Sequence, residues 1–159
     1  HKNLKAMRQN VNELEKLGDR IGGIKFDRVV SVEMFEHMKN YKILLSNLKS
    51  LMKCDGQLFV HMFVHKDKPY HFESGWMSRW FFTGGTMISH ELLGRFNDDM
   101  EMKQSWIVNG VHYSYTLETW LHLMDVNEME VKKALGGIYG NDDKTITQWW
   151  YLWRTFFIA

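Results

Sequence analysis

Residues 26–40, FDRVVSVEMFEHMKN, constrain the fold more than any other part of the chain. An apolar, β-branched run ends at Glu33, and a segment with helical spacing follows it directly. A strand that passes straight into a helix delivers its last side chains to the carboxyl edge of a sheet, where open α/β folds bind ligands. Glu33, Glu36 and His37 are therefore the first candidates for chemistry.

The segments around this stretch predict a strand, a helix and a second strand in succession. Residues 24–33 are continuous enough in apolar character for a strand that is buried on both faces. Residues 34–52 repeat apolar side chains at helical spacing, and residues 58–64, LFVHMFV, predict a second buried strand. A strand, a helix and a strand in this order predict a parallel crossover, and hence an α/β sheet.

Other segments have less regular patterns. Residues 66–86 have no clean period and are dense in aromatic side chains, so they predict an irregular cover over a pocket, with a turn at Gly84-Gly85. The remaining predicted elements are a strand-compatible start at 3–14, a loop at 15–23, a short helix capped by Ser89, a strand at 100–108, a helix at 116–124 capped by Thr116, and a long helix from Asp143 to the end.

Composition places the chain among ordinary globular proteins. Its 159 residues are 45% hydrophobic and 25% charged, which fits one domain spanning residues 1–159. A net charge of +1 does not favour nucleic acid or an anionic membrane as the main partner. No stretch is apolar and long enough for a transmembrane segment, and the single cysteine, Cys54, fits a reducing compartment, so we expect a cytoplasmic protein.

Both ends of the sequence interrupt a pattern. The chain begins with His1 and stops within the apolar run WRTFFIA, whereas helices usually close with glycine or with a basic last turn. We therefore expect a piece of a longer protein that is truncated at both ends. A processed terminus or an artificial boundary is the alternative.

The spacing of Glu33, Glu36 and His37, which we call the acidic cluster, suggests a chemical role for them. Glu33 and Glu36 are three residues apart, and Glu33 and His37 are four apart, so one helical face would hold all three if the helix begins there. A partly buried carboxylate pair can deprotonate an amine, or hold an anion through a shared proton. The structural alternative is a helix N-terminus, where acidic residues interact favourably with the helix dipole.

Residues farther along the chain are candidates for the same site. Adjacent parallel strands place their carboxyl ends side by side, so His61 or His65 is expected to approach Glu36. A hydrogen-bonded core histidine is the alternative for His61. Tyr113 follows a predicted turn, from which its hydroxyl group could donate into the site.

Other chemistries have weaker support. No HExxH or paired-cysteine spacing accompanies the histidines and carboxylates, so no metal site is predicted. The glycine pairs lack the strand and helix that flank a phosphate loop, and no nucleophile has a base beside it. The aromatic side chains of residues 66–86 could hold a cation on their ring faces, or pack only as core and lid.

Six sequence blocks in a fixed order carry a resemblance to a known family: SVEMFEHMKNY, LFVHMFVHK, YHFE, WFFTGGTM, WIVNGVHYSYTLETWL and WWYLWRTFFIA. Over roughly its whole length the chain resembles the coclaurine N-methyltransferase branch of the cyclopropane-fatty-acyl-phospholipid synthase (mycolic acid cyclopropane synthase) family. The resemblance implies an S-adenosylmethionine-dependent enzyme with a Rossmann-like class I methyltransferase sheet. The first two strands and the last strand of that sheet would be missing, and an aromatic-rich cover would lie over the acceptor site.

The resemblance also implies roles for individual residues. In the amine-methylating branch, Glu36 and His37, with Glu33 nearby, match the residues that orient and deprotonate the acceptor. In the lipid-cyclopropanating branch, Glu36, His61 and Tyr113 match the residues that hold a bicarbonate used as a base.

The resemblance implies an incomplete cofactor site. Residues 3–10 match the third strand of the family's sheet, and Asn10 stands where an acidic residue often lies near the adenine, so it is the expected cofactor contact. The glycine-rich loop and the acidic residue that binds the ribose belong to the first two strands. We therefore expect the chain as given to bind S-adenosylmethionine poorly or not at all.

Together these observations predict the C-terminal part of an S-adenosylmethionine-dependent methyltransferase that N-methylates a small, coclaurine-like amine. One alternative is a cyclopropane-fatty-acyl-phospholipid synthase that acts on unsaturated lipid acyl chains. Another is a non-catalytic fragment or a partial gene model.

Overall fold

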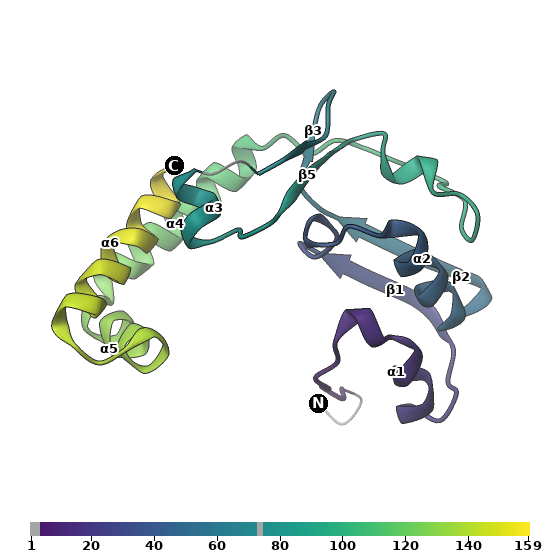
Figure 1. The fold of residues 1–159 in the computed structure, drawn as a ribbon, viewed down its shortest axis with the longest axis horizontal. Helices are drawn as coiled ribbons and strands as arrows, with labels where there is room; N and C mark the ends of the chain where they lie inside the picture. The colour runs from purple at the N-terminus through teal and green to yellow at the C-terminus, as the bar shows by residue number, and fades with distance from the viewer. Residues whose placement is uncertain (1–3, 73–74) are drawn as a thin grey trace. The chain divides into compact units, whose positions relative to one another are not determined.

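The computed structural model describes residues 4–72 and 75–159, and the chain divides into two compact units, His1–Gln104 and Ser105–Ala159. The first unit contains two small sheets with short helices, and the second consists of helices α4, α5 and α6 (Figure 1). The single domain predicted for residues 1–159 remains a prediction.

The first unit is built on the strand–helix–strand crossover that the sequence predicts. Strands β1 (Phe26–Val32) and β2 (Met52–His61) pair in parallel, and helix α2 (Tyr41–Ser50) connects them (Figure 1). At the carboxyl ends of the two strands Val32 is paired with His61. The residues that follow β1 are therefore close to the end of β2.

Helix α2 covers one face of the β1–β2 sheet. The helix presents its apolar stripe to the strands, as its spacing predicts. The buried side chains of this core are Leu14, Phe35, Tyr41, Leu44, Leu45, Leu48, Leu51 and Ile88. Val29 of β1 and Leu58 and Val60 of β2 pack against them from the sheet.

The opposite face of the β1–β2 sheet is exposed. Val30 is 67% exposed, Val32 is 57% exposed and Phe59 is 40% exposed. The prediction of strands that are buried on both faces is therefore wrong for this structure, because apolar side chains alternate between the two faces and α2 covers only one of them.

The predicted helix over residues 34–52 is divided in two. A 3₁₀ turn, η2 (Phe35–His37), comes first, and α2 starts after it. The side chain of Asn40 accepts a hydrogen bond from the backbone N–H of Ile43 at 3.1 Å, and this N-cap fixes where α2 begins. The acidic cluster therefore lies on a turn rather than on one face of a helix.

A second small sheet lies in the aromatic-rich part of the first unit. Strand β5 (Thr86–Ser89) pairs in parallel with β3 (Val64–His65) and antiparallel with β4 (Tyr70–His71). A short helix, α3 (Trp76–Trp80), lies between β4 and β5 in the sequence. Residues 66–86 are thus more regular than the sequence predicts, and residues 73 and 74 of this stretch lie outside the described residues.

Several other predictions for the first unit are wrong. A strand needs a paired neighbour for its backbone groups, and residues 4–10 and 100–108 have none and form no strand in the structure. The 3₁₀ turn η1 (Val11–Glu13) and helix α1 (Glu15–Arg20) take the place of the predicted strand end and loop. Ser89 is the last residue of β5 rather than a helix cap. The 3₁₀ turn η3 (Leu93–Arg95) takes the place of the predicted short α-helix.

The second unit packs α4 (Val111–Val126), α5 (Glu128–Tyr139) and α6 (Asp143–Ile158) around a small aromatic core. Helix α4 begins before the predicted cap at Thr116, whereas α6 starts at the predicted residue because the side chain of Asp142 accepts from Thr145 N–H at 2.9 Å. No helix in the described part of the chain is long and apolar enough to cross a membrane.

Alanine substitutions at two adjacent glycines of α5 are expected to have opposite effects on the stability of the second unit. A Cβ atom on Gly136 would lie 2.8 Å from Oδ1 of Asn141, whereas a Cβ atom on Gly137 would meet nothing within 4 Å. We expect Gly137→Ala to stabilise the unit by about 0.5–1 kcal/mol through helix propensity, and Gly136→Ala to destabilise it by about 1 kcal/mol through overpacking. Urea unfolding of both variants measures the difference, and equal stability would contradict the packing at Gly136.

Candidate active site

The carboxyl ends of β1 and β2 hold a pair of side chains, Glu33 and His61. Oε1 of Glu33 lies 2.8 Å from Nδ1 of His61, and the backbone N–H of Glu33 donates to the carbonyl of His61 at 2.9 Å. Glu33 has a φ angle of 53°, in the left-handed region that side chains with a Cβ atom rarely adopt. The two bonds to His61 hold Glu33 in this strained conformation.

Glu36 is a buried carboxyl group beside this pair. Its side chain lies on η2, and the residue is only 7% exposed. The pKa of Glu36 is raised to about 7, mainly by burial and also by the charge of Glu33 and a hydrogen bond with it, while a backbone hydrogen bond and the charge of His61 act in the opposite direction. Oε2 of Glu36 is buried and has no hydrogen-bond partner among the described residues. Glu36 can therefore gain or lose a proton near neutral pH.

The raised pKa of Glu36 predicts that the stability of the first unit depends on pH. Folding raises this pKa from 4.5 to about 7, so between these values the folded chain keeps a proton that the unfolded chain has lost. The contribution of Glu36 to stability is therefore most favourable below pH 4.5 and is lost as the pH rises through 7. Denaturant unfolding at several pH values should show a larger loss in the wild type than in Glu36→Gln, which cannot ionise. Equal losses would contradict the raised pKa.

His37 lies at the end of a row of aromatic rings. Its imidazole stacks on Phe82 with ring centroids 6.1 Å apart and an interplanar angle of 23°. Phe82 contacts Phe72 at 5.9 Å, and Phe72 contacts Tyr70 at 6.1 Å. We call His37, Phe82, Phe72 and Tyr70 the aromatic row. It joins the predicted catalytic segment to the predicted aromatic cover.

The glycine pair of WFFTGGTM does more than form a turn. Gly84 has a φ angle of 71°, as a turn glycine often does. Gly85 is buried, and a Cβ atom on it would lie 2.3 Å from Cδ2 of Phe72. The backbone N–H of Phe72 also donates to the carbonyl of Gly85 at 3.0 Å. The absence of a side chain at Gly85 thus makes room for one ring of the aromatic row.

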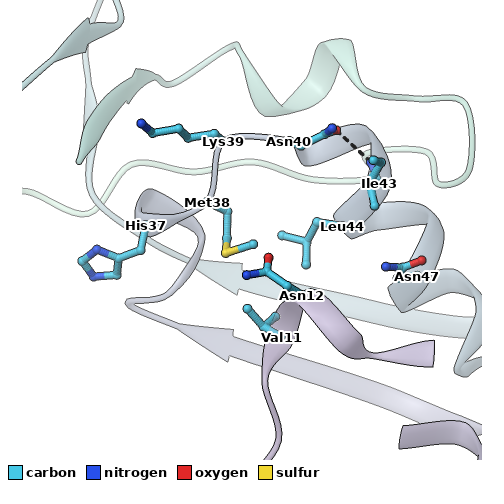
Figure 2. Close-up of a pocket in the computed structure, with 9 residues that line it drawn as sticks. All are labelled: Val11, Asn12, His37, Met38, Lys39, Asn40, Ile43, Leu44 and Asn47. Atoms are coloured by element: carbon cyan, nitrogen blue, oxygen red, sulfur yellow. Dashed lines mark hydrogen bonds between the residues drawn. The ribbon is translucent and has the colours of Figure 1, made fainter. Parts of the chain in front are cut away.

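A pocket of about 380 Å³ opens beside η2, and Figure 2 shows its lining. Asn12, Asn40 and Asn47 contribute amides, and the remaining lining residues are Val11, His37, Met38, Lys39, Ile43 and Leu44. In Figure 2 the ring of His37 points away from the amides of Asn12 and Asn47. Asn10 does not line the pocket, because its side chain caps η1 by accepting from Asn12 N–H at 3.0 Å.

The other predicted site residues lie elsewhere. Nδ1 of His65 accepts from the backbone N–H groups of Asp67 and Lys68 at 3.2 and 3.0 Å, so of the two histidines it is His61 that pairs with the acidic cluster. Tyr113 lies in the first turns of α4, in the second unit, and its ring contacts Trp120 at 6.1 Å. A place for Tyr113 beside Glu36 stays a prediction.

Two contacts near the cluster were not predicted from the sequence. Phe82 stacks on His37, and the hydroxyl of Tyr41 donates to the carbonyl of Phe35 at 2.9 Å. The helical pattern assigns Tyr41 to the apolar face of a helix, and a lone hydroxyl on such a face is the signal that points to a buried hydrogen bond. Across residues 4–72 and 75–159, no group of three His, Cys, Asp or Glu side chains is arranged to hold a metal ion.

Comparison with known proteins decides the family. A family profile described as mycolic acid cyclopropane synthetase matches residues 3–152 of the chain. The chain belongs to the mycolic acid cyclopropane synthetase family. This family member is 38% identical over 138 residues to (S)-coclaurine N-methyltransferase of Papaver somniferum, covering 83% of the chain and 39% of the relative. It is 36% identical over 140 residues to the same enzyme of Thalictrum flavum subsp. glaucum, covering 84% of the chain and 39% of the relative.

A solved structure agrees with the fold of this member of the mycolic acid cyclopropane synthetase family. The crystal structure of coclaurine N-methyltransferase bound to N-methylheliamine and SAH matches with a TM-score of 0.74 and 30% identity. The match covers 85% of this chain and 42% of that chain. The chain therefore has part of a methyltransferase fold, and it spans about two fifths of the length of the relatives it matches.

Proposed function

We propose that the chain is the acceptor-binding part of an S-adenosylmethionine-dependent N-methyltransferase that acts on a small amine. The observation that carries the proposal is Glu36, a buried carboxyl group with a pKa of about 7 beside the Glu33–His61 pair. A base with a pKa near the working pH is well matched to proton transfer from an amine.

The acidic cluster would deprotonate the acceptor amine. An amine that is protonated in neutral water has no free electron pair, so its N–H bond must break before nitrogen can react. The carboxylate of Glu36 accepts this proton, and the electron pair of the bond stays on nitrogen. Glu33 interacts with Glu36 through its charge and is bonded to His61, whose side chain is 48% exposed and connects the cluster with solvent.

The aromatic row would orient the acceptor. Ring faces attract ammonium groups and stack on flat rings, so Phe72 and Phe82 can hold an amine that carries an aromatic ring. His37 stands at the end of the row that is nearest in sequence to Glu36. Orientation of this kind supplies much of the rate in a direct displacement, because the reacting atoms must be aligned.

The pocket beside η2 fits the adenine part of the cofactor. Its amides at Asn12 and Asn47 can pair with the edge of an adenine ring, and its apolar walls at Val11 and Leu44 can contact the ring faces. When bound, S-adenosylmethionine supplies an activated methyl group on a cationic sulfur. Asn10 would act indirectly, by holding the turn that carries Asn12.

The names of the similar proteins support an amine as the acceptor. The relatives at 38% and 36% identity are both coclaurine N-methyltransferases, and the solved structure holds N-methylheliamine. The family description names cyclopropane synthesis, so an unsaturated lipid acyl chain remains the alternative acceptor. A non-catalytic fragment is the third possibility.

An exchange of segments tests the proposal. The matched segment of the Papaver somniferum enzyme is replaced by the corresponding residues of this chain, and we call the product the chimera. It is incubated with methyl-labelled S-adenosylmethionine and either a tetrahydroisoquinoline amine or vesicles of unsaturated phospholipid. We expect labelled N-methyl amine. Cyclopropanated lipid without methylated amine would overturn the amine proposal, and a folded chimera that binds cofactor but forms neither product would favour the non-catalytic alternative.

Calorimetry on the chain alone tests the cofactor expectation. We expect no micromolar binding of S-adenosylmethionine, because the pocket beside η2 supplies contacts for adenine only. Micromolar affinity would show that the chain needs no further residues to hold the cofactor.

A further inference from the structure

The backbone carbonyl of Phe35 is bonded twice. It accepts from the backbone N–H of Met38 at 2.9 Å, which closes η2, and from the hydroxyl of Tyr41 at 2.9 Å. Phe35 is fully buried and Tyr41 is 3% exposed, so water cannot replace the hydroxyl without a structural change. The turn that carries Glu36 is thus tied to α2 by one buried side chain.

Tyr41 is itself held rigidly. It is the first residue of α2, directly after the N-cap Asn40. Its ring stacks on Phe35 with centroids 6.1 Å apart and an interplanar angle of 18°, and it contacts Phe96 at 5.6 Å. Contacts with two other rings restrict the orientation of the Tyr41 ring, so its hydroxyl oxygen is held within hydrogen-bond distance of the Phe35 carbonyl.

The hydroxyl of Tyr41 remains a donor at every pH at which the site could work. Burial raises the pKa of Tyr41 to about 12, and the nearby carboxylate of Glu36 contributes to the shift. The same interaction shows that the two side chains are close enough to affect each other electrostatically.

We infer that Tyr41 is a positioning residue for Glu36. Its hydroxyl holds the turn Phe35–His37 against α2, and this keeps the Glu36 carboxyl group buried. The inference rests on the proposed function for its catalytic meaning, since Glu36 is the proposed base. Its structural content is testable on the chain alone, separately from any activity.

The test is a carbon-13 NMR titration of the glutamate carboxyl groups in the full chain. Tyr41→Phe keeps the ring and removes only the hydroxyl. We expect the Glu36 midpoint to fall by about 0.5–1 pH unit from its wild-type value near 7, because a looser turn admits water to the carboxylate. An unchanged midpoint in Tyr41→Phe would overturn the inference.

Two control variants separate this effect from a general loss of stability. Leu48→Val weakens the same core from the far end of α2, and Tyr151→Phe removes the hydroxyl of an exposed tyrosine in the second unit. Both should leave the Glu36 midpoint at the wild-type value. A fall in Leu48→Val as large as that in Tyr41→Phe would assign the effect to stability alone and overturn the inference.

Hydrogen exchange gives a second measurement. In Tyr41→Phe the amide of Met38 should exchange about tenfold faster relative to the amides in the middle of α2, since only the turn is released. If Tyr41→Phe does not fold, the wild-type chain still tests the inference. Its buried Tyr41 hydroxyl proton should exchange slowly enough to give its own NMR signal. Absence of that signal would overturn the inference.

Discussion

In the chimera, Glu36→Gln is expected to lower the turnover of the amine by about 10²–10⁴-fold, the usual contribution of a general base. Glutamine has nearly the same size and can occupy the same buried site, but it cannot accept a proton. Because Glu36 has a pKa of about 7, the rate with wild-type Glu36 should also rise with pH through this value, as the carboxylate forms. In Glu36→Gln this step in the pH profile should be absent.

The matched control for this substitution is Glu91→Gln. Glu91 is an exposed glutamate in the same unit, outside the aromatic row, the pocket and the acidic cluster. It should leave both turnover and the pH profile unchanged. Turnover of Glu36→Gln within about threefold of the wild type, with the same pH profile, would refute the role of Glu36 as base.

Phe35→Ala is expected to destabilise the first unit by about 3–5 kcal/mol, the range for removal of a fully buried aromatic ring. Phe35 is 0% exposed, and its ring stacks on Tyr41 at the centre of the core formed by α2 and the sheet. The substitution would remove this contact and leave a cavity beneath η2. Urea unfolding, followed by a probe in the first unit, measures the loss.

Phe59→Ala is the control for the loss of a phenylalanine ring. Phe59 lies on the exposed face of the β1–β2 sheet and is 40% exposed, so its removal should cost about 1 kcal/mol or less. Equal losses in Phe35→Ala and Phe59→Ala would mean that the two faces of the sheet are covered to the same extent.

Patterns that depend on neighbours along the chain could be predicted from the sequence. The β-branched run of β1, the apolar stripe of α2 and the apolar run within β2 each indicate an element, and their order indicates the parallel pairing. The long C-terminal helix, α6, was predictable for the same reason, together with its first residue, Asp143. The boundaries were less predictable, because a cap such as Asn40 can stop a periodic pattern at any turn.

Part of the candidate site was also predictable. The carboxyl ends of parallel strands meet, so the sequence predicts that His61 or His65 approaches Glu36. In the structure His61 does lie at this edge, but the carboxylate 2.8 Å from its ring belongs to Glu33. The predicted reason for grouping Glu33 with Glu36 was wrong, since a left-handed residue and a 3₁₀ turn take the place of a helical face. The aromatic row could not be predicted, because it joins rings from four separate positions through contacts that no sequence period encodes.

The sequence by itself determined the family, the order of the strands and helices around the crossover, and the kinds of chemical group at the end of β1. Only the tertiary structure decided which of these groups is buried. Glu36 is 7% exposed while His37 beside it is open to solvent, and their adjacent places in the sequence do not distinguish them. Burial, and with it the pKa of a carboxyl group, depends on what packs against a residue from elsewhere in the chain.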